Sequence, residues 1–291
     1  MIARRHVLLG GLTALIGARA SAQDRIRVVA SFSILGDLVR NVGGDRLEVA
    51  TLVGPDSDAH AFSPTPADAR TLGGAKAVVV NGLGLEGWMT RLVKASGGKA
   101  PLVVATQGIA TRTLEGAVDP HAWQSVANVK VYVANIRDGL SKADAAGRSR
   151  YEANAAFYLG KLDALERDVR AAIGQIPAER RKIITTHDAF GYFGAAYGLT
   201  LIAPEGVSTD NEPSARDVAR IITQIKLQKI PALFMENIVD PRLMRQIARE
   251  TGAKVGGTLY SDALSGAAGP ATTYIDMMRH NVAELSKALA P

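Results

Sequence analysis

Short runs of apolar, largely β-branched residues recur along the chain and alternate with helical patterns. Near-continuous apolar strands that alternate with helices predict parallel sheets covered by helices on both faces. We therefore predict an α/β fold of two lobes, each a mostly parallel four-stranded sheet flanked by helices. The predicted strands cover residues 26–32, 48–53, 77–82 and 101–106 in the first lobe, and 182–187, 199–204, 232–237 and 253–260 in the second.

Between the two halves, a longer apolar stripe predicts one helix over residues 145–176. Roughly 30 residues at a rise of 1.5 Å each give a rod of about 45 Å, long enough to run beside both lobes. We therefore expect a rigid link between a lobe of residues 23–144 and a lobe of residues 177–291, with little swinging motion. The stripe recurs at spacings of three and four and consists of Tyr151, Ala155, Leu159, Leu162, Leu165, Val169, Ile173 and Ile176.

The first 22 residues have the pattern of an export signal. Arg4 and Arg5 precede an apolar stretch over residues 7–16, and Ala-Ser-Ala at 20–22 is typical of a cleavage site. The stretch is shorter than the ~20 residues of a membrane helix, so we expect no membrane insertion. We expect export to the periplasm and cleavage after about Ala22. The arginine pair leaves both the general and the twin-arginine export routes open.

The cysteine content and the net charge bear on how the protein is anchored and on which partners it binds. None of the 291 residues is a cysteine, so the sequence offers neither a disulfide nor a thiol for a lipid anchor, which favours a free periplasmic protein. The formal net charge of +6 falls to +3 when the three arginines of residues 1–22 leave. So small an excess, without a basic run, does not indicate nucleic-acid binding. We expect a monomer.

Three of the five histidines occur where strands are expected to end. His60 follows the second predicted strand, and the helix after it is expected to be capped by Thr65. His121 precedes a helical pattern, His187 closes a strand, and Asp262 follows the last strand. Ligands of open α/β sheets bind beyond the carboxyl ends of strands, so these side chains are candidates to converge. Three imidazoles and one carboxylate form a set suited to zinc.

Each histidine taken singly is more typical of a structural residue than of a ligand. His6 falls in the expected signal, and His280 lies in a terminal helical pattern where a polar surface position is expected. Two acidic residues near the candidate ligands, Asp188 and Glu236, allow two interpretations. Either could orient a ligand imidazole or cap a turn, with capping favoured for Asp188 and neither role favoured for Glu236.

A glycine pattern invites a nucleotide-binding interpretation that its context opposes. Gly82, Gly84 and Gly87 match G-x-G-x-x-G between a strand and a helix. A dinucleotide site also needs an acidic residue about 20 residues later, where this chain has Ala-Thr-Gln at 105–107. We interpret the glycines as a tight turn. Motifs of serine hydrolases, P-loop enzymes and H-E-x-x-H metalloproteases are missing from the sequence, so we predict no catalytic residues and no enzyme.

These residues together resemble one family closely, the zinc- and manganese-type periplasmic solute-binding proteins of metal ABC importers (solute-binding family 9). The resemblance runs in family order from about residue 26 to the end. It is carried by the segments VVASFSILGDLVRNVGGD, LVGPDSDAHAFSPTPAD, VVVNGLGLEGW, DPHAWQSVANV, TTHDAFGYFGAAYGL, GVSTDNEPSARD and LYSDALS.

The resemblance implies two lobes joined by a single long helix, with one metal ion in the cleft between them. It places His60, His121, His187 and Asp262 on the family's four ligand positions. It also implies delivery of the ion to a membrane permease driven by an ATPase. Two departures stand out: Asp-Ala-His where the family commonly has Asp-Pro-His, and no histidine in residues 84–120, where many zinc-dedicated members carry a histidine-rich loop.

The third ligand position bears on the choice of metal. The resemblance implies glutamate there in many manganese-type members and histidine in zinc-type ones, and here the residue is His187. Nitrogen-rich sites bind zinc more tightly than manganese, so we expect Zn²⁺, with Mn²⁺ as the alternative. Two alternatives from other classes stay open: a zinc hydrolase with water in the fourth position, and an adhesin or organic-solute receptor on the same fold.

Overall fold

The computed structural model describes residues 25–114, 116–210 and 213–290. The expected signal over residues 1–22 lies outside the described residues. Among the described helices, none is both long enough and apolar enough to cross a membrane.

The N-terminal sheet has the strand order β2-β1-β3-β4, and all its strands are parallel. Its strands lie close to the predicted apolar runs, and the two central strands, β1 and β3, are deeply buried whereas β2 and β4 at the edges are partly exposed. A small antiparallel hairpin, β5-β6, follows the sheet along the chain. The elements are β1 (Ile26–Phe32), α1 (Ser33–Gly43), η1 (Gly44–Arg46), β2 (Leu47–Val53), α2 (Pro66–Gly73), β3 (Ala77–Val80), α3 (Met89–Ser96), β4 (Leu102–Val104), β5 (Thr113–Leu114), β6 (Ala117–Val118), η2 (Ala122–Gln124) and α4 (Val126–Ala143).

The C-terminal sheet is also parallel, with the order β10-β9-β7-β8. Two four-stranded parallel sheets flanked by helices confirm the predicted fold class. The elements after α4 are η3 (Ala145–Gly147), α5 (Arg148–Gly174), η4 (Ala178–Arg180), β7 (Lys182–Ile184), α6 (Gly191–Tyr197), β8 (Thr200–Ile202), α7 (Ala215–Gln228), β9 (Ala232–Glu236), α8 (Arg242–Thr251), β10 (Lys254–Leu259) and α9 (Tyr274–Leu289).

Strand β7 ends at Ile184, three residues earlier than the apolar pattern predicts. The reason is a side chain, because Glu236 Oε1 accepts hydrogen bonds from the backbone N–H groups of Thr186 at 2.7 Å and His187 at 3.1 Å. These two N–H groups therefore donate to a carboxylate and not to the backbone carbonyls of a neighbouring strand. The chain therefore leaves the sheet just before His187.

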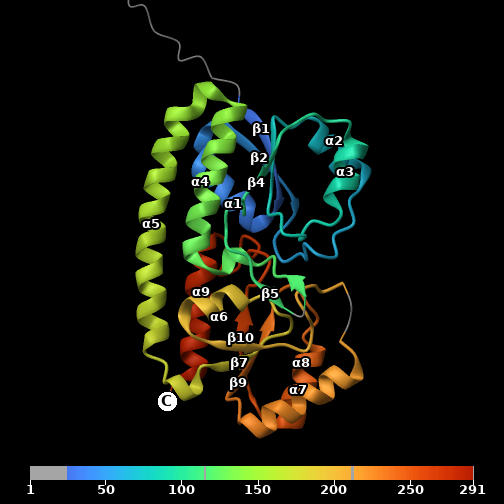
Figure 1. Ribbon diagram of the computed structural model, residues 1–291, viewed down its shortest axis with the longest axis vertical. Helices are drawn as coiled ribbons and strands as arrows, with labels where there is room; N and C mark the ends of the chain where they lie inside the picture. The colour runs from blue at the N-terminus through green and yellow to red at the C-terminus, as the bar shows by residue number, and fades with distance from the viewer. Residues whose placement is uncertain (1–24, 115, 211–212, 291) are drawn as a thin grey trace, which may run out of the picture.

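Helix α5 is the longest element and runs beside both sheets on one side of the molecule (Figure 1). Its buried face matches the predicted stripe except at one step, where Tyr158 is buried and Leu159 only partly so. Helix α9 packs against α5 and also reaches the N-terminal half, since the backbone N–H of Tyr274 donates to Asp37 Oδ2 at 2.9 Å. Both long helices therefore tie the two sheets together.

The buried apolar side chains form two separate cores. The larger core is continuous across both halves, from β1 and α1 through α4 and α5 to α6 and α9. The smaller core lies between the C-terminal sheet and helices α7 and α8. Its buried members are Ile184, Ile221, Ile225, Ile230, Leu233, Met244 and Ile247.

Candidate metal centre

The four residues predicted as metal ligands lie together between the two sheets. His60 lies in the loop between β2 and α2, and His121 immediately precedes η2. His187 lies three residues beyond β7, and Asp262 lies three residues beyond β10. One ligand atom from each residue lies within 4.8 Å of the other three. Loops that follow parallel strands meet at one edge of a sheet, and the two sheets present these edges to each other.

The distances between these atoms suit a single small cation. His60 Nε2 lies 3.1 Å from His121 Nε2 and 3.2 Å from Asp262 Oδ2. Asp262 Oδ2 lies 3.3 Å from His187 Nε2, and Asp262 Oδ1 lies 3.6 Å from His121 Nε2. A tetrahedron with bonds of ~2.0–2.1 Å has edges of roughly 3.3–3.4 Å, which is the spacing of zinc ligands.

Several polar atoms at the centre lack hydrogen-bond partners. Among the described residues, His187 Nε2 and both carboxylate oxygens of Asp262 are buried without a partner in hydrogen-bonding geometry. Leaving buried polar atoms unpaired costs about 1–3 kcal/mol each. A divalent cation accepts all these lone pairs at once, so the donor set fits a metal ion.

Two further carboxylates contact the Nδ1 atoms of His187 and His121. Glu236 Oε2 lies 2.6 Å from His187 Nδ1, and Asp119 Oδ1 lies 2.9 Å from His121 Nδ1. The Asp119 contact is a hydrogen bond that holds His121 with Nε2 toward the centre, and the Glu236 carboxylate holds the His187 ring through its charge. Glu236 thus has an orienting position, one of the two roles left open for it. Asp119 was missed, although its position two residues before His121 is a usable signal, since Asp58 stands in the same relation to His60.

Burial and neighbouring charges shift the pKa values of these groups in opposite directions. Burial alone lowers the pKa of His187, but the Glu236 and Asp262 carboxylates outweigh it and hold the pKa well above its usual value. Burial likewise lowers the pKa of His121, and Asp262 and Asp119 raise it overall. Burial raises the pKa of Asp262, but His121 and His187 bring it well below its usual range. The surrounding carboxylates therefore favour the protonated forms of His121 and His187, and a metal ion must displace those protons.

The Asp262 loop is attached to the opposite half of the molecule. The carbonyl of Ser261 accepts hydrogen bonds from Trp123 Nε1 at 2.8 Å and Gln124 Nε2 at 2.7 Å. The backbone N–H of Leu264 donates to Ser33 Oγ at 3.0 Å. These bonds place Asp262 beside His121, and moving the loop away requires all of them to break.

The His60 loop is anchored at its downstream end. Thr65 and Asp68 form a capping box at the start of α2, with Pro66 in the first turn, as predicted for Thr65. Trp88 Nε1 donates to the carbonyl of Ala59 at 3.0 Å, a buried contact directly before His60. The side chain of His60 is 4% exposed, whereas those of the other three candidate ligands are fully buried.

The glycine-rich turn is filled by the side-chain carboxyl group of Glu86. Glu86 accepts hydrogen bonds from the N–H groups of Asn81 at 2.6 Å and Gly82 at 3.0 Å, and from Ser31 Oγ at 2.6 Å. Gly82 and Gly84 have φ values of 85° and 87°, a conformation that favours glycine. The amides that a bound phosphate would need are therefore occupied by Glu86.

His280 and Asp188 lie outside the cluster of candidate ligands. His280 is half-buried rather than a surface group, because its Nε2 lies 3.0 Å from the carbonyl oxygen of Thr258 and its ring packs on Tyr260. The backbone N–H of Asp188 donates to the carbonyl of Gly206 at 3.0 Å.

Comparisons with known proteins agree over nearly the whole chain. Residues 28–288 match the family described as zinc-uptake complex component A, periplasmic. The manganese-binding lipoprotein MntA of Halalkalibacterium halodurans is 36% identical over 92% of this chain and 93% of its own. The iron-binding protein YfeA of Yersinia pestis is 33% identical over 90% of this chain and 86% of its own.

A solved structure agrees as well. The periplasmic zinc-binding protein TroA of Treponema pallidum superposes with a TM-score of 0.88 and 31% identity, over 92% of this chain and 100% of that one. The chain thus belongs to the family of periplasmic zinc-uptake complex components A, the metal solute-binding proteins.

Proposed function

We propose that this chain captures one divalent transition metal ion between its lobes, with His60, His121, His187 and Asp262 as ligands. The observation that carries the proposal is the convergence of three imidazoles and one carboxylate within 4.8 Å, with buried lone pairs that no group in the described chain satisfies. Such a set binds a borderline cation, whereas calcium and magnesium prefer oxygen ligands.

Zinc is the proposed ion, with manganese as the alternative. Three nitrogen donors place zinc above manganese in the affinity order of first-row metals. The relatives named above are described by zinc, manganese and iron in turn, so family membership alone leaves the metal open. The choice of zinc therefore rests on the histidine at position 187, which makes three of the four proposed ligands nitrogen donors.

The ion is cargo rather than a catalyst. The family consists of substrate-binding components, not enzymes. Asp262 takes the fourth ligand position, which a zinc hydrolase keeps for water. We propose that the loaded chain docks on a membrane permease driven by an ATPase and releases the ion there.

Export precedes this role. We propose that residues 1–22 are removed and that the mature chain is a free periplasmic monomer, with residues 23–144 and 177–291 as lobes and 145–176 as the link. The lack of cysteine in the sequence supports a chain without a lipid anchor. Mass spectrometry of protein recovered from its own periplasm should give a first residue near Gln23.

Elemental analysis of that same protein tests the choice of ion. We expect one zinc per chain, and competition at pH 7.5 should show zinc displacing manganese. His187→Ala and Asp262→Ala should each lose stoichiometric binding, while His280→Ala, which removes a histidine outside the cluster, should keep it. Manganese in the native protein, or equal binding by the His187 variant, would contradict the proposed ion or ligand set.

A further inference from the structure

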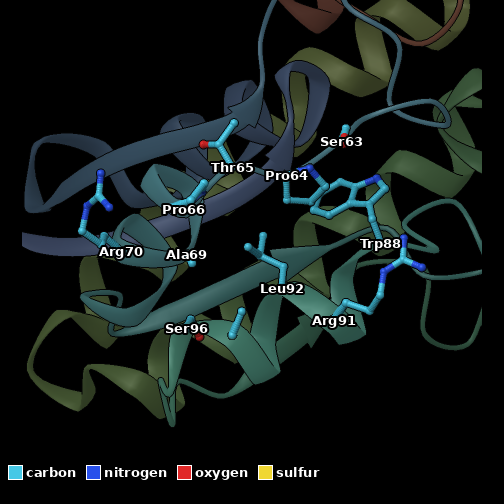
Figure 2. Close-up of a pocket in the computed structure, with 11 residues that line it drawn as sticks. Ser63, Pro64, Thr65, Pro66, Ala69, Arg70, Trp88, Arg91, Leu92 and Ser96 are labelled. Atoms are coloured by element: carbon cyan, nitrogen blue, oxygen red, sulfur yellow. The ribbon is translucent and has the colours of Figure 1, made fainter.

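A hollow of about 600 Å³ lies between helices α2 and α3 and is separate from the metal centre. Both helices lie on the side of the N-terminal sheet away from α5 (Figure 1). Figure 2 shows Leu92 in its middle, with Arg70 at one end and with Trp88 and Arg91 at the other. The hollow is open to solvent because Thr65, Arg70 and Arg91 on its rim are exposed.

The lining of the hollow combines apolar walls with positive charge. Its apolar surface comes from Pro64, Pro66, Ala69, Trp88, Leu92 and Ala95. None of the residues that line it is acidic. Within the described chain, neither Arg70 nor Arg91 has an ion pair or a side-chain hydrogen bond. An occupant with negative charge and an apolar part would match this surface.

The hollow shares its wall with the loop that carries His60. Residues 63–66 line the hollow and continue directly from that loop. Trp88 lines the hollow, donates to the carbonyl of Ala59, and packs its ring 4.8 Å from that of Phe62. Two contacts therefore join the wall of the hollow to the loop that carries the least buried of the candidate ligands.

We propose that this hollow receives an acidic, partly apolar periplasmic segment of the partner permease. The inference rests on the proposed function and adds the place and chemistry of docking. Charge complementarity selects the occupant, because the two arginines at the ends of the apolar floor lack acidic partners of their own. Docking at the wall of the His60 loop puts the partner beside the ligand that a release step must move.

The test reverses the charge of the hollow in the full-length chain. Arg70→Glu/Arg91→Glu is compared with Arg148→Glu/Arg167→Glu, which makes the same charge change on exposed positions of α5. The assay is stimulation of ATP hydrolysis by the cognate permease in lipid vesicles, together with zinc affinity and sedimentation of each variant. We expect the hollow variant to need at least about 10-fold more protein for half-maximal stimulation, with zinc affinity unchanged, and the α5 variant to match the wild type.

Each outcome separates the two proposals. Equal stimulation by the hollow variant and the wild type overturns the docking site and leaves metal capture standing. A wild-type chain that binds zinc but never stimulates the permease overturns delivery, and the docking site with it. Self-association of the wild type that the hollow variant abolishes would assign the hollow to a second copy of this chain and overturn the permease as its occupant.

Discussion

At the scale of single residues, the carboxylates behind the imidazoles decide how the centre behaves. Glu236 accepts from two backbone amides through Oε1 and contacts His187 through Oε2, so it both ends β7 and turns the ring. Asp119 combines a backbone and a ring contact in the same way at His121. The centre therefore depends on five carboxylate contacts that are not themselves ligand contacts.

Glu236→Gln tests this dependence. The amide oxygen of glutamine can still accept from Thr186 and His187, but the negative charge at His187 Nδ1 is lost. Loss of such a partner lowers metal affinity about 10–100-fold, so we expect that drop with little change in the melting temperature. Chelator competition measures the affinity, and Asp138→Asn on the exposed face of α4 is the control. Unchanged affinity would show that Glu236 only shapes the backbone.

His187→Glu tests the choice of metal at the same position. The substitution replaces a nitrogen donor by oxygen, which manganese prefers relative to zinc. We expect the ratio of zinc to manganese affinity to fall, as measured by competition between the two ions at pH 7.5. An unchanged ranking of the metals would place selectivity elsewhere in the centre.

The raised pKa values at the centre predict that zinc stabilises the fold more at high pH than at low pH. The raised pKa values of His121 and His187 stabilise the metal-free fold below the ordinary histidine pKa of about 6.5, and this contribution is lost as pH rises through the raised values. Metal binding strengthens over the same rise because fewer protons must leave. We expect the gain in melting temperature on adding zinc to be larger at pH 8.0 than at pH 5.5. An equal gain at both pH values would speak against histidine ligation.

The four candidate ligands could be picked out from the sequence, but the residues that contact them could be predicted only in part. His60, His121, His187 and Asp262 stand out because histidine is scarce and each falls after a strand or before a helix. Glu236 ends β9 and meets His187, which follows β7, only through the pairing of β7 with β9, which a single sequence does not specify. Register between distant strands is set by packing, so such partners need a structure.

At the scale of elements, the helix that follows the His60 loop is fixed by its first turn. The side chain of Thr65 accepts from the N–H of Asp68, and Asp68 accepts from the N–H of Thr65. The cap was predictable from the sequence because all the residues that form it lie within the segment Thr-Pro-Ala-Asp. It could not predict the early end of β7, since the residue responsible lies 50 positions away.

Thr65→Ala removes the cap and leaves the ligands untouched. Loss of a threonine cap costs about 1 kcal/mol, so we expect a fall of roughly 2–4 °C in the melting temperature of the metal-free protein. Thr113→Ala, in an exposed strand of the hairpin, is the matched control and should change little. A fall of the same size in the melting temperatures of both variants would show that the Thr65 cap contributes no more than an ordinary exposed threonine.

At the scale of the whole molecule, one continuous core joins the two sheets. The larger core passes through α5 and α9 into both halves, and the Asp262 loop is hydrogen-bonded across the centre. Such a frame resists the wide hinge closure of binding proteins with flexible links. The two α/β halves were predictable from the alternation of strands and helices in the sequence. The contact between the start of α9 and Asp37 was not predictable, because the two residues that form it lie far apart in the chain.

Calorimetry tests the shared core. We expect a single unfolding transition for the metal-free protein, because neither half can lose its part of the larger core alone. Zinc at 100 times its dissociation constant should add about 2.7 kcal/mol to the free energy of unfolding and move that transition as a unit. Two separate transitions would contradict a common core.

The smaller core between α7, α8 and the C-terminal sheet has a different consequence. Its seven buried side chains make a layer distinct from the larger core, and one of them, Ile184, ends the strand β7 that leads to His187. A layer held by few contacts opens with a lower free energy than the whole fold. In amide hydrogen exchange, the backbone of α7 and α8 should therefore take up deuterium long before that of α5. Brief loosening of this layer should therefore relax the segment that carries His187, while the hydrogen bonds of the Asp262 loop to the N-terminal half stay in place.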